Sequence, residues 1–273
     1  MTIIPLVSVI VATYNWKHER LSKSIDSVLN QTFKDFELII INDASTNDIE
    51  RTILEYVKKD KRVIYLKNDK NLQLTRTLNK WIEYSKWKYI TRIDDDDIWI
   101  NKDKLEKQVK FMEENPDYWL CWAWEIINID EDWNTINKVK MRLPDAEIRN
   151  SILQSNQFAH SSIMMRKSIL DEVWIYNPKY NKAEDYELWC RIGIKSKFSN
   201  LKDIGLKYRI NSNWISTKNY FYQRKLWLKI CILYHKYYPN FFKAIILRIW
   251  DLLLPTTVSK KLLNFLKLKW ILA

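Results

Sequence analysis

Val7–Thr13 reads VSVIVAT, an unbroken run of apolar and β-branched residues that predicts a strand covered on both faces. Phe36–Asn42, FELIIIN, has the same character. Two further strands are expected at residues 62–66 and 88–93. Apolar residues at helical spacing predict helices between these strands, at residues 18–31, 47–59 and 74–85. This alternation predicts right-handed crossovers and a parallel sheet over roughly the first 100 residues.

Beyond residue 100 the order of elements becomes mixed. Helices are expected at residues 101–115, 145–153 and 184–196. Strands are expected at residues 119–129 and 161–166, with a pair of strands over residues 198–210. From residue 219 the chain is expected to be helical, with breaks near Pro239 and Pro255. The expected fold class is therefore α/β, a mostly parallel sheet flanked by helices and followed by a helical extension.

The charge of the chain is concentrated near its C-terminus. Of the 273 residues, 47% are hydrophobic and 29% are charged, which suits a protein with a core rather than a membrane-embedded bundle. The net charge is +12, but from residue 217 onward eleven Lys and Arg accompany a single acid, Asp251. The remaining body is nearly neutral, which argues against nucleic-acid binding, since such proteins carry basic surface on the folded body. No apolar run reaches the ~18 residues that a membrane span needs.

Cysteine usage and the N-terminus indicate a cytoplasmic protein. Cys121, Cys190 and Cys231 are odd in number, far apart and form no CxxC pair, so a disulfide framework or a zinc site is not expected. The first residues, MTIIPLVSVIVATYN, have no basic segment before the apolar run. They resemble a buried strand more than a signal peptide.

The chain has 14 Trp and only 2 Gly, whereas glycine averages about 7% of residues in proteins. Trp16 and Trp214 follow Asn, Trp133 lies in a polar turn and Trp87 follows a predicted helix, all places that favour glycine. Our hypothesis is that UGA codons for glycine are read here as Trp; the alternative is a protein genuinely rich in Trp. The positions concerned are Trp16, Trp81, Trp87, Trp119, Trp122, Trp124, Trp133, Trp174 and Trp214.

Four consecutive aspartates, residues 94–97, directly follow the fourth predicted strand. Like charges repel one another, and open α/β sheets bind their ligands at the carboxyl ends of strands. A divalent cation such as Mg²⁺ or Mn²⁺ would relieve the repulsion, because hard cations prefer carboxylate oxygens. The simpler alternative is a solvated acidic loop that caps the next helix. The strand before the run and the apolar Ile98 and Trp99 after it favour the metal site.

Polar residues also follow the first two strands. Residues 42–48, NDASTND, come after the second strand, and one of residues 45–47 would cap the next helix. Capping leaves Asp43 unexplained. The first strand ends in VATYN, residues 11–15. Because the carboxyl ends of parallel strands meet at one edge, these segments and the aspartates describe one crevice.

A fourth motif, residues 182–189 (KAEDYELW), opens an amphipathic helix with Glu184 and Asp185. Acids in a first turn commonly compensate the helix dipole, so this motif alone is equally well explained without a function.

Together, the four motifs resemble the family 2 glycosyltransferases of the GT-A fold, over roughly residues 6–215. The family's first strand ends in a stretch matched by residues 12–15, and its nucleotide loop is matched by residues 42–48. Its Asp-x-Asp-Asp motif is matched by Asp94, Asp96 and Asp97, and its Glu-Asp-Tyr-x-Leu-Trp motif by residues 184–189. The resemblance is to bacterial-type, non-processive members, because the Gln-x-x-Arg-Trp motif of processive members is absent.

The resemblance implies an inverting transfer of a sugar from a nucleotide-sugar donor, expected to be a UDP-sugar, to a hydroxyl of a carbohydrate or lipid-linked acceptor. Surface polysaccharide or glycolipid synthesis is the expected setting. Asp185 is expected to be the general base and Glu184 to orient it, while Asp94 and Asp96 are expected to hold Mg²⁺ or Mn²⁺. Donor binding is expected from Ala12, Thr13, Tyr14, Asn15, Asp43, Arg76, Asp94 and Asp95. His160 is expected either to line the acceptor side or to be a hydrogen-bonded structural histidine.

The resemblance also implies a GT-A domain over residues 1–215, with a nucleotide-binding half (1–100) and an acceptor half (101–215). Residues 216–273 then form a basic, amphipathic helical tail. Its mixture of Lys and Arg with aromatic and aliphatic residues predicts contact with a membrane surface through residues 218–273; the alternative is a helical cap packed on the domain. The expected location is cytoplasmic, peripheral on the inner face of the membrane.

Two other functions were weighed from the sequence. A sugar-phosphate nucleotidyltransferase would need a glycine-rich, basic loop near the first strand to hold a triphosphate, and the sequence has none. A noncatalytic nucleotide-sugar-binding module would bind the donor but would not need Asp185.

Overall fold

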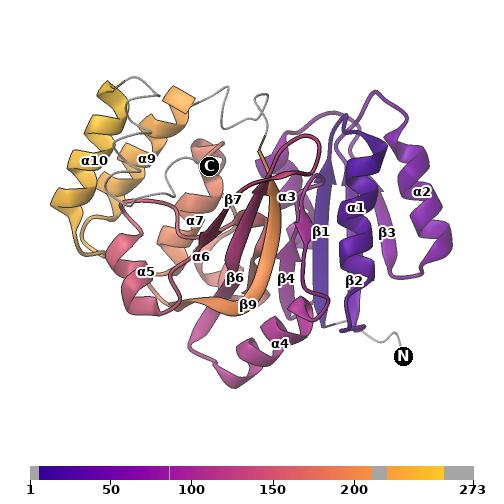
Figure 1. Cartoon of the computed structure of the whole chain (residues 1–273), viewed down its shortest axis with the longest axis horizontal. Helices are drawn as coiled ribbons and strands as arrows, with labels where there is room; N and C mark the ends of the chain where they lie inside the picture. Colours follow the sequence, from indigo (N-terminus) through magenta and orange to yellow (C-terminus); the bar gives the residue numbers. More distant parts are fainter. Residues whose placement is uncertain (1–5, 86, 211–219, 255–273) are drawn as a thin grey trace.

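A computed structural model describes residues 6–85, 87–210 and 220–254 of the chain. A nine-stranded mixed sheet runs through this part, with helices on both sides (Figure 1). Its first half is parallel and has the order β3-β2-β1-β4. These strands are β1 (Val7–Thr13), β2 (Phe36–Asn42), β3 (Val63–Lys67) and β4 (Tyr89–Arg92). The α/β class expected from the sequence is confirmed.

The second half of the sheet continues from β4 with mixed directions. β8 (Met164–Arg166) pairs antiparallel with β4, and β6 (Tyr118–Ile129) pairs antiparallel with β8. β9 (Lys197–Arg209) lies parallel to β6, and the two-residue β5 (Ile98–Trp99) pairs with its far edge. β7 (Thr135–Lys140) forms a hairpin with β6. One sheet therefore joins the two halves of the chain.

Helices cover both faces of the sheet. Strand β1 contributes apolar side chains to the hydrophobic core on each face. Val9 and Val11 point into one hydrophobic cluster, whereas Ile10 points into the other, because successive side chains of a strand alternate between faces. The first cluster includes α1 (His18–Leu29), α2 (Ile49–Lys59) and α4 (Lys104–Glu114). The second includes α3 (Leu74–Tyr84), α5 (Asp145–Ser151), α6 (Lys167–Val173), α7 (Glu184–Ile192), α9 (Tyr220–Tyr234) and α10 (Phe241–Leu253).

Two sequence predictions need correction. The pair of strands expected over residues 198–210 is wrong, because β9 is one continuous strand. Its register against β6 shifts between Ala123 and Glu125, and Asp203 has a φ of 64°, so a bulge takes the place of a turn. Only the end of the strand expected at residues 161–166 forms, as β8, because a short 3-10 helix, His160–Ser162, precedes it.

Two of the tryptophans proposed to be glycines have the backbone conformation that favours glycine. Trp133, in the turn between β6 and β7, and Trp174, at the end of α6, both have a φ of 69°. Trp81 and Trp122 are buried, and their indole N–H groups have no hydrogen-bond partner within the described residues. Trp214 lies outside the described residues, and the glycine hypothesis stays a prediction for all nine positions.

The last described elements are α9 and α10, separated near Pro239 as expected. They lie at the end of the molecule opposite α2 (Figure 1). Among the described helices, none is long and apolar enough to cross a membrane. Residues 211–219 and 255–273 lie outside the described part, so the basic tail as a whole remains a prediction.

Candidate active site

The loops that follow β1 and β2 are bonded to each other. Thr13 ends β1 beside Asn42 at the end of β2, and the Asp43 amide donates to the Thr13 carbonyl at 2.9 Å. Asn15 has a φ of 56°, and its side-chain oxygen accepts from the Thr46 amide at 2.7 Å. Asn is one of the few residues that adopt this conformation readily. The sequence places these polar segments at one edge, and the structure confirms that they lie together.

Asp43 fixes the loop between β3 and α3. Its Oδ1 accepts hydrogen bonds from Asn68 Nδ2 at 2.7 Å, from Thr77 Oγ1 at 2.8 Å and from the Leu72 amide at 2.9 Å. The carboxylate is buried, and these donors hold its orientation. A ligand that reaches Asp43 thus meets a preorganised acceptor.

The other residues expected to bind donor differ in exposure. Thr13 is buried, Ala12 is partly buried, and Tyr14 and Asn15 are exposed at the rim. Arg76 is exposed on α3. The same helix begins close to the second half of the chain, since Thr75 Oγ1 donates to Asn181 Oδ1 at 3.2 Å. Its first turn therefore joins the two halves.

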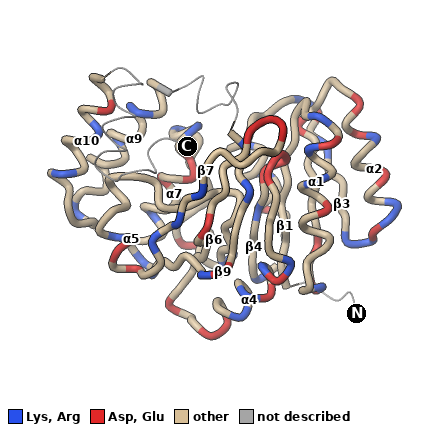
Figure 2. The backbone as a smooth tube through the Cα atoms, viewed as in Figure 1, with Lys and Arg blue, Asp and Glu red and all other residues tan. Residues whose placement is uncertain are grey.

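Residues 94–97 form a tight turn after β4. The Asp97 amide donates to the Asp94 carbonyl at 3.2 Å, and Ser24 Oγ donates to the Asp97 carbonyl at 2.6 Å. The Arg209 amide, at the end of β9, donates to Asp97 Oδ1 at 3.0 Å. Asp95, Asp96 and Asp97 are buried, whereas the Asp94 side chain is 31% exposed. Acidic residues gather at this edge of the sheet (Figure 2).

This acidic turn suits a divalent cation by its chemistry. Burial, and next the neighbouring Asp96, raise the pKa values of Asp95 and Asp97 well above the ordinary value. Asp95 Oδ2 and Asp97 Oδ2 are buried without a hydrogen-bond partner among the described residues. Uncompensated carboxylate oxygens of this kind fit a hard cation. As placed, however, no group of three His, Cys, Asp or Glu within the described residues surrounds one point closely enough to hold a metal.

Arg92, the last residue of β4, lies at the centre of the site. Its buried guanidinium donates to Asp94 Oδ1 and to His160 Nδ1. Burial lowers its pKa, but Asp94 and then Tyr176, Glu184 and Asp185 raise it, and the net direction is upward. Arg92 thus lies within electrostatic reach of carboxylates from both halves of the chain.

His160 is a hydrogen-bonded histidine, as one of the two expectations has it. Burial, and next the Arg92 charge, lower the pKa of His160 well below its ordinary value, so the ring is neutral. Because Arg92 can only donate, Nδ1 accepts and Nε2 carries the proton. Nε2 then donates to the Tyr176 hydroxyl at 2.6 Å. The ring ties β4 to the loop before α7.

The acidic pair opens α7 on the other side of Arg92. Asp185 is partly buried and accepts from Asn156 Nδ2 at 3.0 Å; Glu184 is buried and accepts from the Lys182 amide at 2.5 Å. Burial and then Asp185 raise the pKa of Glu184 to about 7. Burial also raises the pKa of Asp185, while Arg92 lowers it. A carboxylate with a raised pKa is a stronger base, which suits proton abstraction from a hydroxyl.

Four residues of this site have no role predicted from the sequence: Arg92, Asn156, Ser161 and Arg209. Ser161 Oγ accepts from the Asp94 amide at 2.6 Å, and its carbonyl accepts from Trp99 Nε1 at 2.8 Å. Arg92 could have been found from the sequence, since a cation two residues before four acids at a strand end is positioned to compensate them. The others come from distant segments and only the fold brings them here.

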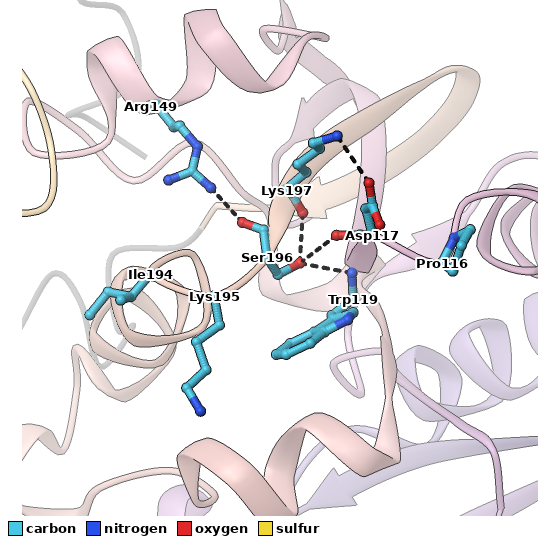
Figure 3. A pocket seen from close by; sticks show the side chains of 8 residues that line it. All are labelled: Pro116, Asp117, Trp119, Arg149, Ile194, Lys195, Ser196 and Lys197. Carbon is cyan, nitrogen blue, oxygen red and sulfur yellow. Dashed lines mark hydrogen bonds and ion pairs between the residues drawn. The ribbon is translucent and has the colours of Figure 1, made fainter.

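A hollow of about 460 Å³ lies elsewhere, beside the first residues of β6 and β9 (Figure 3). These two strands run parallel, and both begin at the edge opposite the acidic turn. Its basic side chains are paired with acids: Lys197 with Asp117 at 3.1 Å, and Lys195 with Glu172 at 2.9 Å. We assign no function to this hollow.

Comparison with known proteins agrees with the geometry. The profile of the family described as Glycosyl transferase family 2 matches residues 8–174. An uncharacterized glycosyltransferase, MJ1057 of Methanocaldococcus jannaschii, is 35% identical and the match covers 95% of this chain and 93% of that protein. The Escherichia coli UDP-Glc:alpha-D-GlcNAc-diphosphoundecaprenol beta-1,3-glucosyltransferase WfgD is 29% identical, over 81% of this chain and 84% of WfgD.

A solved structure shares the fold. The mannosyltransferase PcManGT from Pyrobaculum calidifontis, in complex with GDP-Man and Mn²⁺, superposes with a TM-score of 0.67 at 14% identity, covering 97% of this chain and 76% of that chain. The family profile covers more than half of the chain, and a relative of more than 30% identity matches nearly its whole length. This chain belongs to glycosyl transferase family 2 and is a glycosyltransferase with the GT-A fold.

Proposed function

We propose that this enzyme transfers a sugar with inversion from a UDP-sugar to a hydroxyl of a lipid-linked carbohydrate, in the synthesis of a surface polysaccharide or glycolipid. The observation that carries the proposal is the position of Arg92 between the acidic turn, which faces the donor loops, and the acidic pair of α7. The name of WfgD, with its UDP-Glc donor and diphosphoundecaprenol-linked acceptor, supports the substrate classes.

In this proposal the first hundred residues bind the nucleotide and residues 101–215 bind the acceptor. Asp43 and Thr13, with the exposed Tyr14 above them, receive the base and ribose. Ala12, Asn15, Arg76 and Asp95 complete the donor side. Asp94 and Asp96 are proposed to hold Mg²⁺ or Mn²⁺, which when bound neutralises the charge on the leaving diphosphate.

Asp185 is the proposed general base. Its carboxylate takes the proton from the acceptor hydroxyl while that oxygen forms a bond to C1 of the sugar. The bond between C1 and the diphosphate oxygen breaks, and the nucleoside diphosphate leaves with the electron pair. Glu184 orients Asp185 by holding the start of α7 through the Lys182 amide. Attack opposite the leaving group inverts the configuration at C1.

A lipid-linked acceptor places the reaction at a membrane surface, and we propose that the chain works on the cytoplasmic face. Residues 218–273 of the basic tail are the proposed contact, and α9 and α10 belong to this segment.

A donor screen tests the proposed activity. The full chain is incubated with UDP-glucose, UDP-galactose, UDP-N-acetylglucosamine or GDP-mannose, with and without Mn²⁺, and release of nucleoside diphosphate is measured. We expect release from a UDP-sugar that requires the cation. Consumption of UTP with a sugar phosphate instead would favour a nucleotidyltransferase, and binding without release would favour a noncatalytic module.

A further inference from the structure

Helix α10 presents an apolar stripe to the solvent. Phe242, Ile246, Ile249, Trp250 and Leu253 are all exposed, with Phe242 at 79% and Leu253 at 76%. Their spacing of four, three, one and three residues puts them on one face of the helix. A surface helix normally turns this kind of stripe toward the core.

The opposite face of α10 buries charged residues. Asp251 pairs with Arg224 of α9 at 2.7 Å, and both side chains are almost fully buried. Arg248 is also buried; it lies 4.8 Å from the centre of the Trp227 ring and donates to the Tyr186 hydroxyl at 3.4 Å. Rotating α10 to hide its apolar stripe would pull these charges apart. The outward stripe is therefore fixed by the packing.

Both helices also carry exposed lysines. Lys225, Lys229 and Lys236 are exposed on and after α9, and Lys243 is exposed on α10. Asp251 is the one acid between residues 220 and 254, and it is buried. The exposed side chains of the two helices are thus apolar or positively charged, and Figure 2 shows how few acidic residues these helices contain. A second copy meeting this surface about a two-fold axis would bring lysines against lysines, so self-association is disfavoured.

The two helices are attached to the helix that carries the proposed base. Tyr234 Oη of α9 donates to Glu187 Oε1 at 2.6 Å, and the Tyr238 hydroxyl donates to the Cys190 carbonyl at 2.7 Å. Gln223 Nε2 donates to the carbonyl of Lys182, two residues before Glu184, at 2.7 Å. These hydrogen bonds connect α9 and α10 directly to α7, so a surface that binds the two helices also positions the proposed acceptor side of the site.

We propose that α10 lies in the interface of an anionic lipid bilayer, with its apolar stripe among the acyl chains and the lysines of α9 and α10 on the headgroups. Apolar insertion combined with attraction to anionic headgroups is how interfacial helices bind. This proposal rests on the proposed function and extends it, because it names the surface that docks and the membrane to which it binds. Docking here holds the start of α7 near a lipid-linked acceptor.

Vesicle sedimentation tests the docking face. The full chain is mixed with phosphatidylcholine vesicles, with or without phosphatidylglycerol, and the bound fraction is measured as salt is raised. We expect binding that needs phosphatidylglycerol and weakens with salt. Replacing Phe242, Ile246 and Leu253 by Ser should lower the partition coefficient roughly tenfold or more. Replacing Lys225, Lys229 and Lys236 by Gln should have an effect of similar size, also roughly tenfold.

Control variants remove similar groups elsewhere: two exposed apolar side chains in one variant and three lysine charges in the other. Tyr84→Ser with Ile136→Ser removes exposed apolar side chains, and Lys58, Lys59 and Lys61 to Gln removes three charges; both should bind as wild type does. The proposal is overturned if the wild type does not bind anionic vesicles, or if the variant with Phe242, Ile246 and Leu253 replaced binds them as tightly as the wild type. It is equally overturned if the wild type is a dimer that this variant dissociates, because the stripe would then serve a second copy.

The failure of this proposal is distinguishable from failure of the proposed function. Nucleotide release without vesicles should be the same in the wild type and in the docking variants. If the protein binds vesicles as expected but cleaves no donor, the docking proposal is supported and the proposed transfer from a UDP-sugar is refuted. If the protein cleaves donor but does not bind vesicles, the docking proposal is refuted and the proposed function is supported.

Discussion

The Arg92 guanidinium donates a hydrogen bond to the Asp94 carboxylate, at the point where β4 enters the acidic turn. The same side chain contacts His160 and lies in the field of Glu184 and Asp185, the first residues of α7. One buried cation therefore links the acidic turn with the acidic pair that opens α7.

Replacing Arg92 by Gln tests this link. Arg92 lowers the pKa of Asp185, so its removal should raise that pKa, and the acid limb of the kcat/KM profile should move to higher pH. We also expect kcat to fall by about 10–100-fold, a fraction of the effect of losing a general base. The measurement is the pH–rate profile of nucleotide release. An acid limb that stays in place would show that Arg92 does not act on the base.

Replacing Glu184 should shift the acid limb of the pH–rate profile in the direction opposite to that expected for Arg92→Gln. Burial is the main cause of the raised pKa of Asp185. The neighbouring carboxylates of Glu184 and Asp185 repel each other when both are charged, and this repulsion contributes to the raised pKa of Glu184. Asp185 must lose its proton to act as a base, so activity should increase with pH through this raised value. Glu184→Gln removes a negative neighbour, which should lower the pKa of Asp185 and move the acid limb to lower pH. Glu147→Gln, on exposed surface of α5, serves as the control.

The pair of Arg224 and Asp251 should be important for stability. Both side chains are nearly fully buried at 2.7 Å. Asp251→Ala leaves a buried cation without its partner, and the free energy of unfolding should fall by about 3–5 kcal/mol. Urea denaturation followed by circular dichroism measures the change. The exposed pair of Arg51 and Glu55, 3.9 Å apart, provides a comparison, because Glu55→Gln should change stability by about 0.5 kcal/mol or less.

The glycine hypothesis can be tested chemically and by mutation. Trp174 has φ 69° and ψ 161°, a region almost exclusive to glycine, and Trp133 has φ 69°. Mass spectrometry of the protein from its native source should find Gly at both positions. In recombinant protein, Trp174→Gly should raise the free energy of unfolding by about 1–3 kcal/mol. Intact Trp in the native peptides would refute the hypothesis.

Much of the fold of the first hundred residues could be predicted from the sequence. β1 and β2 have the predicted bounds, because runs such as VSVIVAT and FELIIIN are buried on both faces and leave little ambiguity. The sequence of β7, TINKVK, has no pattern that predicts a strand, because most of its side chains are exposed and, among the described strands, it pairs with β6 alone. The sequence predicts two strands in place of the single strand β9, because the residues at its bulge are of the types that favour a turn.

The site could be predicted only in part, for a physical reason. Asp94 and Asp185 belong to recognisable motifs, and both lie in the field of Arg92. Asn156 and Ser161 belong to none of the four motifs, and their roles depend on contacts with α7 and the acidic turn that span 29 and 67 residues. Short sequence motifs contain no information about such distant contacts.

The most direct test of the central claim is the turnover of Asp185→Asn with the donor that the wild type cleaves. This substitution keeps the shape of the side chain and removes its basicity. We predict that kcat falls by about 10²–10⁴-fold, that calorimetry finds unchanged affinity for UDP, and that Asp171→Asn, on the exposed surface of α6, is as active as the wild type. Wild-type turnover by Asp185→Asn would contradict the assignment of the base and with it the proposed mechanism.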